Sequence, residues 1–319
     1  MKHLIVLNKS AGKGKALEEE VKKAFEGLDY AIYETTGPKS VIPYLKDYFT
    51  KEKELVRVYA CGGDGTINEV ANALVGIPNA ELAIYACGTG NDFIKVYADN
   101  KDYQAVAIRK EQEEKFRDFS RLINGQSTCV DLTKITGPSL EEPLYSINVV
   151  NLGFDAIVGA RGHYYAVNGV PSDAKPKEKD PYTYALNHDA MKHGRYNDIV
   201  IYADGEKLNE KQLLLCTLAQ GNYVGGKFYC APKSNNADGL IDVCVLKTMT
   251  LLGLGLIIGP YTEGKHLNKK KKKIIYRQAK EVKIVAPNDI DLCVDGEMIR
   301  GKEFDAVIVP HSLNVVVPQ

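Results

Sequence analysis

The secondary-structure pattern of this chain changes near residue 125, and that change constrains the fold more than any other feature. Before it, short β-branched runs alternate with amphipathic helical patterns. After it, strand patterns follow one another closely, with turn residues between them. Alternation predicts a parallel sheet with helices on its faces, whereas closely spaced strands predict an antiparallel sandwich or barrel. We therefore expect an α/β domain at residues 1–124, an all-β domain at residues 125–319 and a cleft between them.

The expected elements follow from β-branched runs, from the helical spacing of apolar residues and from turn signals. In the first domain we expect strands at residues 3–7, 30–33, 55–60 and 82–85, and helices at 15–25, 41–49, 67–75 and 104–115. In the second domain we expect strands at residues 127–132, 144–148, 199–202, 213–218, 241–246, 282–285, 291–294 and 306–309, and helices at 183–191 and 251–261. Residues 172–181 have the Pro-rich, charged composition of a mobile loop.

Composition narrows the class of protein. The 319 residues carry 41 Lys and Arg against 41 Asp and Glu, a balance that argues against a nucleic-acid binder or a disordered acidic chain. The longest apolar run, at residues 251–261, is broken by Gly and Pro and falls short of the roughly 20 residues that a membrane span needs. The apolar run at the N-terminus is shorter than the h-region of a secretory signal, about 7–15 residues. We expect a globular, cytoplasmic protein.

The strongest local signal is a glycine-rich loop between the strand expected at 55–60 and the helix expected at 67–75. It reads Gly62, Gly63, Asp64, Gly65, Thr66. Glycines let backbone N–H groups close on a polyanion, and the following helix N-terminus adds unpaired donors. A tight connection needs no acid, whereas a nucleoside triphosphate needs a magnesium ligand. The loop matches neither the Walker A pattern nor the Rossmann pattern.

Two further small-residue, polar loops follow expected strands, at residues 8–14 and 88–93. The carboxyl ends of parallel strands meet at one edge of the sheet, where open α/β sheets bind their ligands. Three such loops therefore predict a nucleotide site at that edge.

With these motifs, the chain resembles the diacylglycerol kinase catalytic-domain family, which includes soluble bacterial lipid kinases related to sphingosine and ceramide kinases. The likeness runs nearly end to end, although Lys9 stands where the family often has Pro and Gly90 where it usually has Ala. The Gly-Gly-Asp-Gly-Thr loop also occurs in NAD kinases, and the later motifs are more specific. The resemblance rests on residues 8–12, 62–66, 88–93, 148 with 153–156, 221–226, 231–232, 237–243, 264–266 and 295–297.

The resemblance implies a nucleotide-binding α/β domain, a C-terminal β-sandwich, ATP with Mg²⁺ in the cleft, and transfer of the γ-phosphoryl group to a lipid hydroxyl. It implies a general base at Glu297 with Asp295 beside it, and a magnesium-linked role for Asp64. It implies a metal near Asp238, with backbone oxygens around Asn235 and Leu240. The residues it assigns to ATP are Asn8, Ser10, Gly12, Thr35 (with Thr36 as an alternative), Gly62, Gly63, Asp64, Gly65, Thr66, Ile67, Asn68, Glu69 and Thr89.

Local pattern alone gives the Asp-Gly residues a simpler explanation. Asp-Gly between alternating strands is a strong hairpin signal, and the triplet at 204–206 matches the triplet at 295–297. Only the order of the motifs favours Glu297 over Glu206 as the base. Asp238 with Gly239 likewise reads as a turn on local grounds.

A basic segment, residues 265–283, holds nine Lys and Arg against one acid, Glu281. Such runs are usually solvated connections, but this one follows the apolar stretch at 251–261. Basic residues near anionic lipid contribute roughly 1 kcal/mol each. We therefore expect transient contact with the anionic inner face of the membrane through this segment.

Several alternatives stay open at this stage. An NAD kinase-like phosphotransferase and a catalytically silent lipid- or nucleotide-binding regulator are the rival functions. Diacylglycerol, phosphatidylglycerol and a sphingoid base all fit as acceptors. The sequence is compatible with a homodimer and does not fix the oligomeric state.

Overall fold

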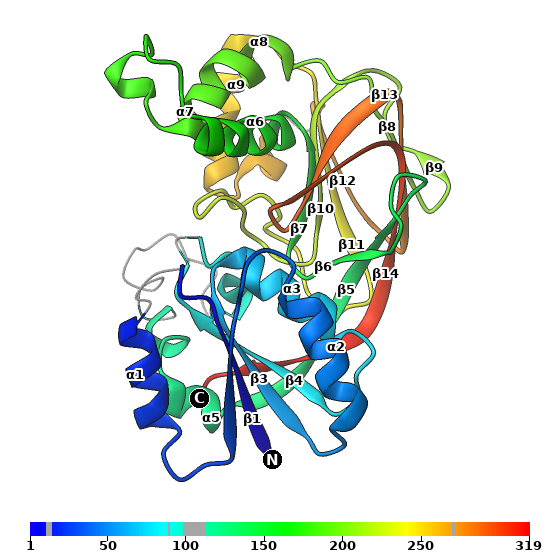
Figure 1. Ribbon diagram of the computed structural model, residues 1–319. Helices are drawn as coiled ribbons and strands as arrows, with labels where there is room; N and C mark the ends of the chain where they lie inside the picture. Colours follow the sequence, from blue (N-terminus) through cyan, green and yellow to red (C-terminus); the bar gives the residue numbers. More distant parts are fainter. Residues whose placement is uncertain (11–14, 89, 98–110, 112, 270–271) are drawn as a thin grey trace.

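The computed structural model of the protein describes residues 1–10, 15–88, 90–97, 111, 113–269 and 272–319. It has two domains, an α/β domain built from the N-terminal part of the chain and a domain of long antiparallel strands above it (Figure 1). This arrangement confirms the predicted fold class.

The lower domain is built on a parallel sheet with the strand order β2-β1-β3-β4. Its helices lie on both faces, with α1 and α5 on one side and α2 and α3 on the other (Figure 1). The strands are β1 (Lys2–Leu7), β2 (Tyr30–Glu34), β3 (Val56–Gly62) and β4 (Ala80–Ala86). The helices are α1 (Lys15–Ala24), α2 (Val41–Lys51), α3 (Asp64–Leu74), η1 (Phe93–Tyr97) and α5 (Phe119–Ile123).

The upper domain is antiparallel, with the strand order β12-β11-β10-β7-β13-β14. Pairing of β8 with β13 and of β5 with β14 folds the sheet over a second apolar core. The strands are β5 (Gln126–Thr136), β6 (Leu144–Ser146), β7 (Val149–Gly153), β8 (Val200–Ala203), β9 (Glu206–Lys207), β10 (Leu213–Ala219), β11 (Ile241–Lys247), β12 (Ile274–Ala279), β13 (Glu281–Val294) and β14 (Glu297–Val317). The helices are α6 (Phe154–Asn168), η2 (Pro176–Glu178), α7 (Pro181–Ala185), η3 (Leu186–Ala190), α8 (Met191–His193), α9 (Leu251–Thr262) and η4 (His266–Asn268).

Strand β14 joins the two domains. It is 21 residues long and pairs with β13 and β5 in the upper domain. A register irregularity between Val309 and Leu313 precedes its last segment, in which Val315 and Val316 pair in parallel with β4. The end of the chain therefore completes the lower sheet, although the predicted boundary at residue 125 assigns it to the second domain.

Several elements differ from the sequence prediction. Residues 282–285 and 291–294 belong to one strand, β13, interrupted only by an irregularity. Strands β7 and β12 and helices α5 and α6 were not predicted. The helix expected at 183–191 lies within an uninterrupted helical stretch, residues 181–193, in which the π-helical turn η3 separates α7 from α8. The expected loop at 172–181 contains η2. Most of the helix expected at 104–115 lies outside the described residues.

Candidate active site

Three polar loops meet at the carboxyl edge of the lower sheet, as the sequence predicts. Asn8, after β1, donates from Nδ2 to Thr66 Oγ1 in the first turn of α3, which follows β3, at 3.1 Å. Gly88, after β4, lies so close to Gly63 that a Cβ on Gly88 would be 2.8 Å from the Gly63 Cα. Only a residue without a side chain fits at this crossing.

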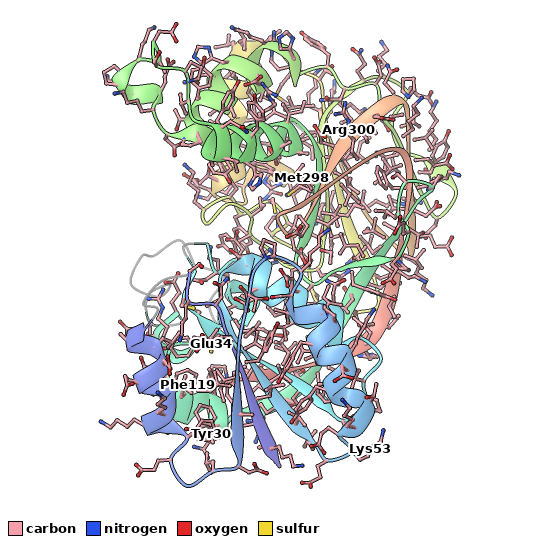
Figure 2. The ribbon with its side chains drawn as sticks, in the orientation of Figure 1. Tyr30, Glu34, Lys53, Phe119, Met298 and Arg300 are labelled. Carbon is pink, nitrogen blue, oxygen red and sulfur yellow. The ribbon has the colours of Figure 1, made fainter. Side chains whose placement is uncertain are left out.

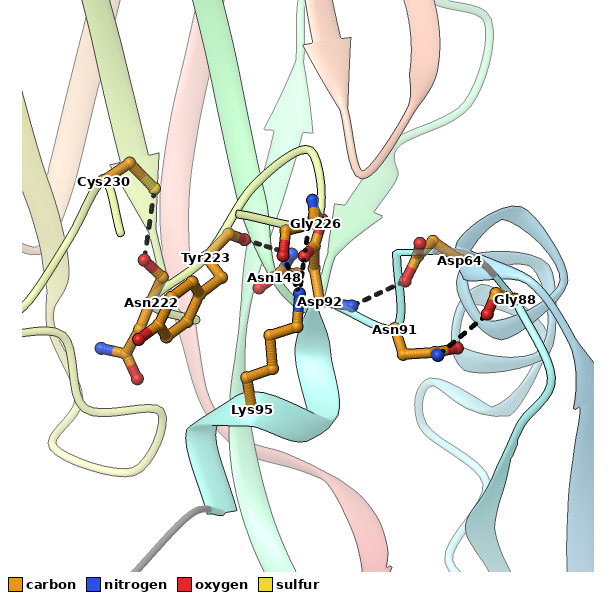
Figure 3. Close-up of polar contacts among 10 residues, drawn as sticks. All are labelled: Asp64, Gly88, Asn91, Asp92, Lys95, Asn148, Asn222, Tyr223, Gly226 and Cys230. Atoms are coloured by element: carbon orange, nitrogen blue, oxygen red, sulfur yellow. Dashed lines mark hydrogen bonds and ion pairs between the residues drawn. The ribbon is translucent and has the colours of Figure 1, made fainter. Parts of the chain in front are cut away.

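Asp64 begins helix α3 at this edge. Gly63 precedes it as the N-cap and provides no side-chain hydrogen bond, so the first N–H groups of α3 stay available to an anion. The Asp64 carboxylate accepts a hydrogen bond from the Asp92 backbone N–H at 3.1 Å (Figure 3). Gly90 makes room for it, because a Cβ on Gly90 would be 2.5 Å from Asp64 Oδ2.

The charge of Asp64 is poorly compensated. Burial raises the pKa of its carboxyl to about 6, and the neighbouring charge of Asp92 adds to the rise. A cation placed between these two acids would relieve the repulsion and lower that pKa.

Asp92 and Lys95 connect the lower domain to the upper domain. Lys95 Nζ lies 2.6 Å from Asp92 Oδ1 and donates to the Gly226 carbonyl at 2.8 Å (Figure 3). The Gly226 N–H donates to the Asp92 carboxylate at 3.0 and 3.1 Å. The Lys95 side chain is 1% exposed, so this pair is withdrawn from water. We call these three residues the interdomain latch.

The loop that carries Gly226 is held from the upper domain. Asn148 donates from Nδ2 to the Tyr223 carbonyl at 3.1 Å, and the Tyr223 and Tyr229 rings stack with centroids 4.5 Å apart. Lys95 lies 5.4 Å from the centre of the Tyr223 ring. The motif at 221–226 therefore forms part of the domain junction (Figure 3).

Asp295 lies in the hairpin between β13 and β14, with φ of 48° at Asp295 and 96° at Gly296. Its carboxylate accepts from Ser146 Oγ at 2.7 Å and from Asn68 Nδ2 at 3.0 Å. Burial raises the pKa of the Asp295 carboxyl, and the hydrogen bonds oppose that rise. Three backbone N–H groups also donate to it, those of Ile147, Asn148 and Val149, at 2.7, 3.1 and 2.8 Å.

This set of donors gives Asp295 a structural task. All its contacts hold the hairpin against β6, β7 and helix α3, and Asn68 of α3 also donates to the Tyr145 carbonyl at 3.2 Å. The carboxylate therefore fixes the hairpin relative to the lower domain.

Glu297 follows in the same hairpin, paired through its backbone with Val294, and its side chain makes no hydrogen bond or ion pair with any described residue. Burial raises the pKa of the nearby Cys293 thiol to about 11. The charges of Asp295, Asp155 and Glu297 add to that rise, so each of these acids lies near the Cys293 thiol. Glu297 is thus a carboxylate held by its backbone beside the domain junction.

The second Asp-Gly-Glu triplet is in a different setting. It forms the turn from β8 to β9, on the side of the upper domain away from the junction (Figure 1). Glu206 is engaged in an ion pair with Arg277 at 2.5 Å. Both triplets are hairpins, as their pattern predicts, but only the one at 295–297 faces the lower domain.

Other residues assigned to ATP have side chains with structural contacts. Glu69 accepts from the N–H groups of Lys39 and Val41 at the start of α2, at 2.9 and 3.4 Å. Ile67 is 2% exposed and packs in the lower core. Any contact of Ile67 and Glu69 with ATP would therefore be made by their backbone atoms.

The remaining residues that the resemblance assigns to ATP lie at the carboxyl edge of the lower sheet or outside the described residues. Ser10 donates its N–H to Asn8 Oδ1 at 3.0 Å, and Thr35 donates its N–H to the Leu7 carbonyl at 3.0 Å. A Cβ on Gly62 would be 2.3 Å from Thr66 Oγ1, so this glycine permits the tight turn. Gly12 and Thr89 lie outside the described residues.

The residues assigned to a metal form a turn before β11. Asp238 Oδ1 accepts from the Leu240 N–H at 3.1 Å, and Asn235 Oδ1 accepts from the Ala237 N–H at 3.1 Å. Gly239, at φ 73°, donates to the buried carboxylate of Asp131 at 2.6 Å. In the described part of the chain, no group of three or more His, Cys, Asp and Glu side chains is arranged to hold a metal.

The pair Asp64 and Asp92 nevertheless fits Mg²⁺ in the way kinases use it. Mg²⁺ commonly takes one or two protein carboxylates and completes its shell with phosphate oxygens and water. Asp64, whose carboxyl pKa is raised to about 6, and the adjacent carboxylate of Asp92 together have the chemistry for such a partial site.

Sequence reasoning did not select Asp92, Lys95, Asn148 or Asp131 as site residues. Asp92 and Asn148 lie in motifs on which the family resemblance rests, so the motifs could have identified them as site residues. Lys95 and Asp131 are each a single charged residue within an apolar stretch of sequence. A charge in such a stretch indicates a buried group with a polar partner.

The comparisons with known proteins agree with this architecture. The family model of the diacylglycerol kinase catalytic domain matches residues 2–135, and that of the YegS C-terminal NAD kinase beta sandwich-like domain matches residues 148–317. A diacylglycerol kinase from Bacillus subtilis (strain 168) is 27% identical over 319 residues, covering 99% of this chain and 96% of that protein. A Yersinia pestis (strain Pestoides F) protein named "Probable lipid kinase YegS-like" is 26% identical over 330 residues, with the same coverage.

Solved structures support the fold. The crystal structure of a diacylglycerol kinase from Bacillus anthracis str. Sterne matches with a TM-score of 0.63 at 20% identity, covering 99% of this chain and 96% of that one. A parallel α/β domain with glycine-rich loops, joined to an antiparallel sandwich, is the two-domain architecture that the two family models describe. Because the two family models together span both domains, the chain belongs to the diacylglycerol kinase family, and it is an enzyme of the kinase class.

Proposed function

We propose that this chain is an ATP-dependent lipid kinase that transfers the γ-phosphoryl group of ATP to a lipid hydroxyl, such as that of diacylglycerol. The observation that carries the proposal is the meeting of Asp64, Asn68 and the hairpin at 295–297 at the domain junction. The names of the relatives support a lipid acceptor.

In this proposal the lower domain holds the triphosphate. The free N–H groups at the start of α3 donate to phosphate oxygens, and the loops with Asn8, Ser10 and Thr35 contact the rest of the nucleotide. Gly12 and Thr89 join them by resemblance.

Asp64 and Asp92 would hold Mg²⁺, which when bound neutralises charge on the phosphate oxygens. The turn at Asn235, Asp238 and Leu240 is a second proposed site, because one carboxylate and two backbone oxygens are ligands that Mg²⁺ accepts.

Glu297 acts as the general base. Its carboxylate takes the proton of the lipid hydroxyl while that oxygen forms a bond to the γ-phosphorus. The bond from the γ-phosphorus to the bridging oxygen breaks, and ADP leaves. Asp295 positions Glu297 by fixing the hairpin through its five hydrogen bonds.

We also propose that the enzyme works in the cytoplasm, at the inner face of the membrane. Within the basic segment, Arg277 pairs with Glu206 and Lys283 pairs with Glu303. Lys265 pairs with Glu263 at 2.9 Å, whereas Lys269, Lys272, Lys273 and Lys280 make no ion pair among the described residues. We assign the membrane contact to Lys269, Lys272 and Lys273, which lie close together in the chain. No helix in the described residues has the length and hydrophobicity to cross a bilayer.

The test is a transfer assay with the purified chain, γ-labelled ATP and Mg²⁺. Separate reactions contain vesicles with diacylglycerol, phosphatidylglycerol or a sphingoid base, or NAD in solution. Label in the organic phase supports the proposal and identifies the acceptor. Label in NAD would instead support the NAD kinase alternative, and no transfer to any acceptor would support a silent binding protein.

A further inference from the structure

Helix α9 exposes an apolar face. Its 12 residues contain no charged side chain, and the polar ones, Tyr261 and Thr262, lie at its end. Leu252 is 75% exposed and Leu256 is 59% exposed. Leu251 and Ile258 are also exposed. We call these four residues the α9 face.

The other side of α9 packs normally. Leu254, Ile257 and Tyr261 are buried against the outer side of the upper sheet, in the same apolar cluster as Phe154 of α6. A helix that is apolar all round is usually buried all round. Here half of such a helix is bare, and contiguous exposed apolar surface marks an interaction site.

Lysines lie at both ends of α9. Lys273 donates from Nζ to the carbonyl of Thr248, just before the helix, at 3.1 Å. Lys265 follows the helix at its other end, where its Nζ lies 2.9 Å from Glu263 Oε2, so an acid compensates its charge. Lys272 is also exposed beside Lys273. An apolar surface with positive charge beside its N-terminal end complements an anionic bilayer, whose negative headgroups overlie apolar chains.

The α9 helix also contacts the loop of the interdomain latch. The Tyr229 N–H donates to the Thr262 carbonyl at 3.4 Å, and Gly264 lies against the Tyr229 ring. Tyr229 in turn stacks on Tyr223, three residues before Gly226. A membrane at the α9 face would therefore lie next to a loop of the proposed active site.

We propose that the α9 face embeds in the headgroup and upper acyl region of an anionic bilayer, while Lys272 and Lys273, beside the N-terminal end of α9, contact lipid headgroups. The proposal rests on the proposed lipid kinase function, since it explains how the enzyme reaches a bilayer-resident substrate. It adds an apolar contribution to the electrostatic contact of the basic segment.

The first experiment uses fluorescence, because the chain contains no Trp. Leu252→Trp places a single reporter on the α9 face. Leu55→Trp is the control, since Leu55 is 41% exposed and Lys53, two residues earlier, lies at the far end of the lower domain (Figure 2). With vesicles of phosphatidylcholine and phosphatidylglycerol, we expect a blue shift and quenching by brominated lipid for Leu252→Trp only.

The second experiment measures vesicle binding by sedimentation without ATP. Leu252→Gln with Leu256→Gln should weaken binding at least about tenfold, because two leucines no longer enter the apolar region. Leu55→Gln should bind as the wild type does. The triple variant Lys269→Gln, Lys272→Gln and Lys273→Gln should bind vesicles more weakly than the wild type at low salt. The weaker binding of the double leucine variant should persist at high salt.

The proposal is wrong if Leu252→Trp shows no change with vesicles, or if the double Gln variant binds as tightly as the wild type. It is also wrong if the α9 face is covered by a second copy of the chain, detected as a dimer that Leu252→Gln dissociates. A parallel assay with a dispersed short-chain diacylglycerol keeps the two claims apart. Transfer there with no vesicle binding would contradict only the α9 proposal.

Discussion

At the scale of single residues, ionisation of Asp64, a proposed magnesium ligand, lowers the stability of the folded protein. Its carboxyl is buried beside Asp92, and burial together with that neighbour raises its pKa to about 6. Because the pKa in the folded state lies above the unfolded value of 3.8, ionisation of this carboxyl lowers the free energy of unfolding. The cost is absent below pH 4, grows between pH 4 and 6, and is complete at pH 7.

Asp64→Asn should therefore stabilise the free enzyme at pH 7 by about 2 kcal/mol while abolishing transfer. The gain should shrink as the pH falls toward 4. Urea unfolding at pH 4, 6 and 8 without Mg²⁺ measures it, with Asp47→Asn on the exposed face of α2 as the control. Equal stability of wild type and Asp64→Asn at pH 8 would refute this account of the Asp64 environment.

Which residues meet at the site was only partly readable from the sequence. Motifs identified Asp64 and the hairpin at 295–297, because glycines and acids next to strands are local features. They did not reveal that Asn68 contacts Asp295, or that Glu69 caps α2. Those contacts join residues far apart in the chain, and spacing within one motif does not encode them.

At the scale of elements, the interdomain latch connects η1 to the loop after β10. Lys95 compensates the charge of Asp92 inside a nearly water-free contact. Removing one partner of a buried pair leaves an uncompensated charge and typically costs about 3–5 kcal/mol, whereas replacing both can be nearly neutral.

Lys95→Met should therefore destabilise the protein by about 3 kcal/mol. It should also weaken binding of ATP, because the contact of Lys95 with the Gly226 carbonyl across the domain junction is lost. Adding Asp92→Asn should restore much of the stability without restoring activity, since a proposed magnesium ligand is lost. Urea unfolding and kinetic titration of ATP separate the two effects. Lys207→Met, in an exposed pair with Glu210, is the control. A wild-type KM for ATP in Lys95→Met would contradict the role of the latch.

The alternation of strands and helices in the first domain could be predicted, because each element there has a clear period and loop signals at both ends. Strand β7 and helix α6 were missed for physical reasons. Only two residues separate the end of β6 from the start of β7, and α6 follows β7 directly through Gly153 at φ 82°. Helix α6 buries only Phe154, Ala156 and Gly162, so it has no pronounced apolar stripe.

At the scale of the whole molecule, β14 makes the two domains interdependent. Its last residues, Leu313, Val315 and Val316, are buried in the lower core although they are far from it in sequence. No local pattern in the sequence predicts that the final strand returns to the first sheet.

Deleting residues 312–319 should destabilise the lower domain by about 5 kcal/mol, since three buried apolar side chains contribute about 1.5–3 kcal/mol each. Limited proteolysis should then cut first within residues 1–124. A chain lacking only the exposed Gln319 should resist as the wild type does. If the lower domain resists proteolysis after deletion of residues 312–319, the last part of β14 is not needed for the stability of that domain.

The central claim is that Glu297, at the domain junction, activates a lipid hydroxyl for transfer from ATP. The most direct measurement is the initial rate of label transfer to diacylglycerol vesicles for the wild type, Glu297→Gln and Glu206→Gln. We predict transfer by the wild type, an unchanged rate for Glu206→Gln and a loss of about 10²–10⁴-fold for Glu297→Gln. A Glu297→Gln enzyme that phosphorylates the lipid at the wild-type rate would contradict the account.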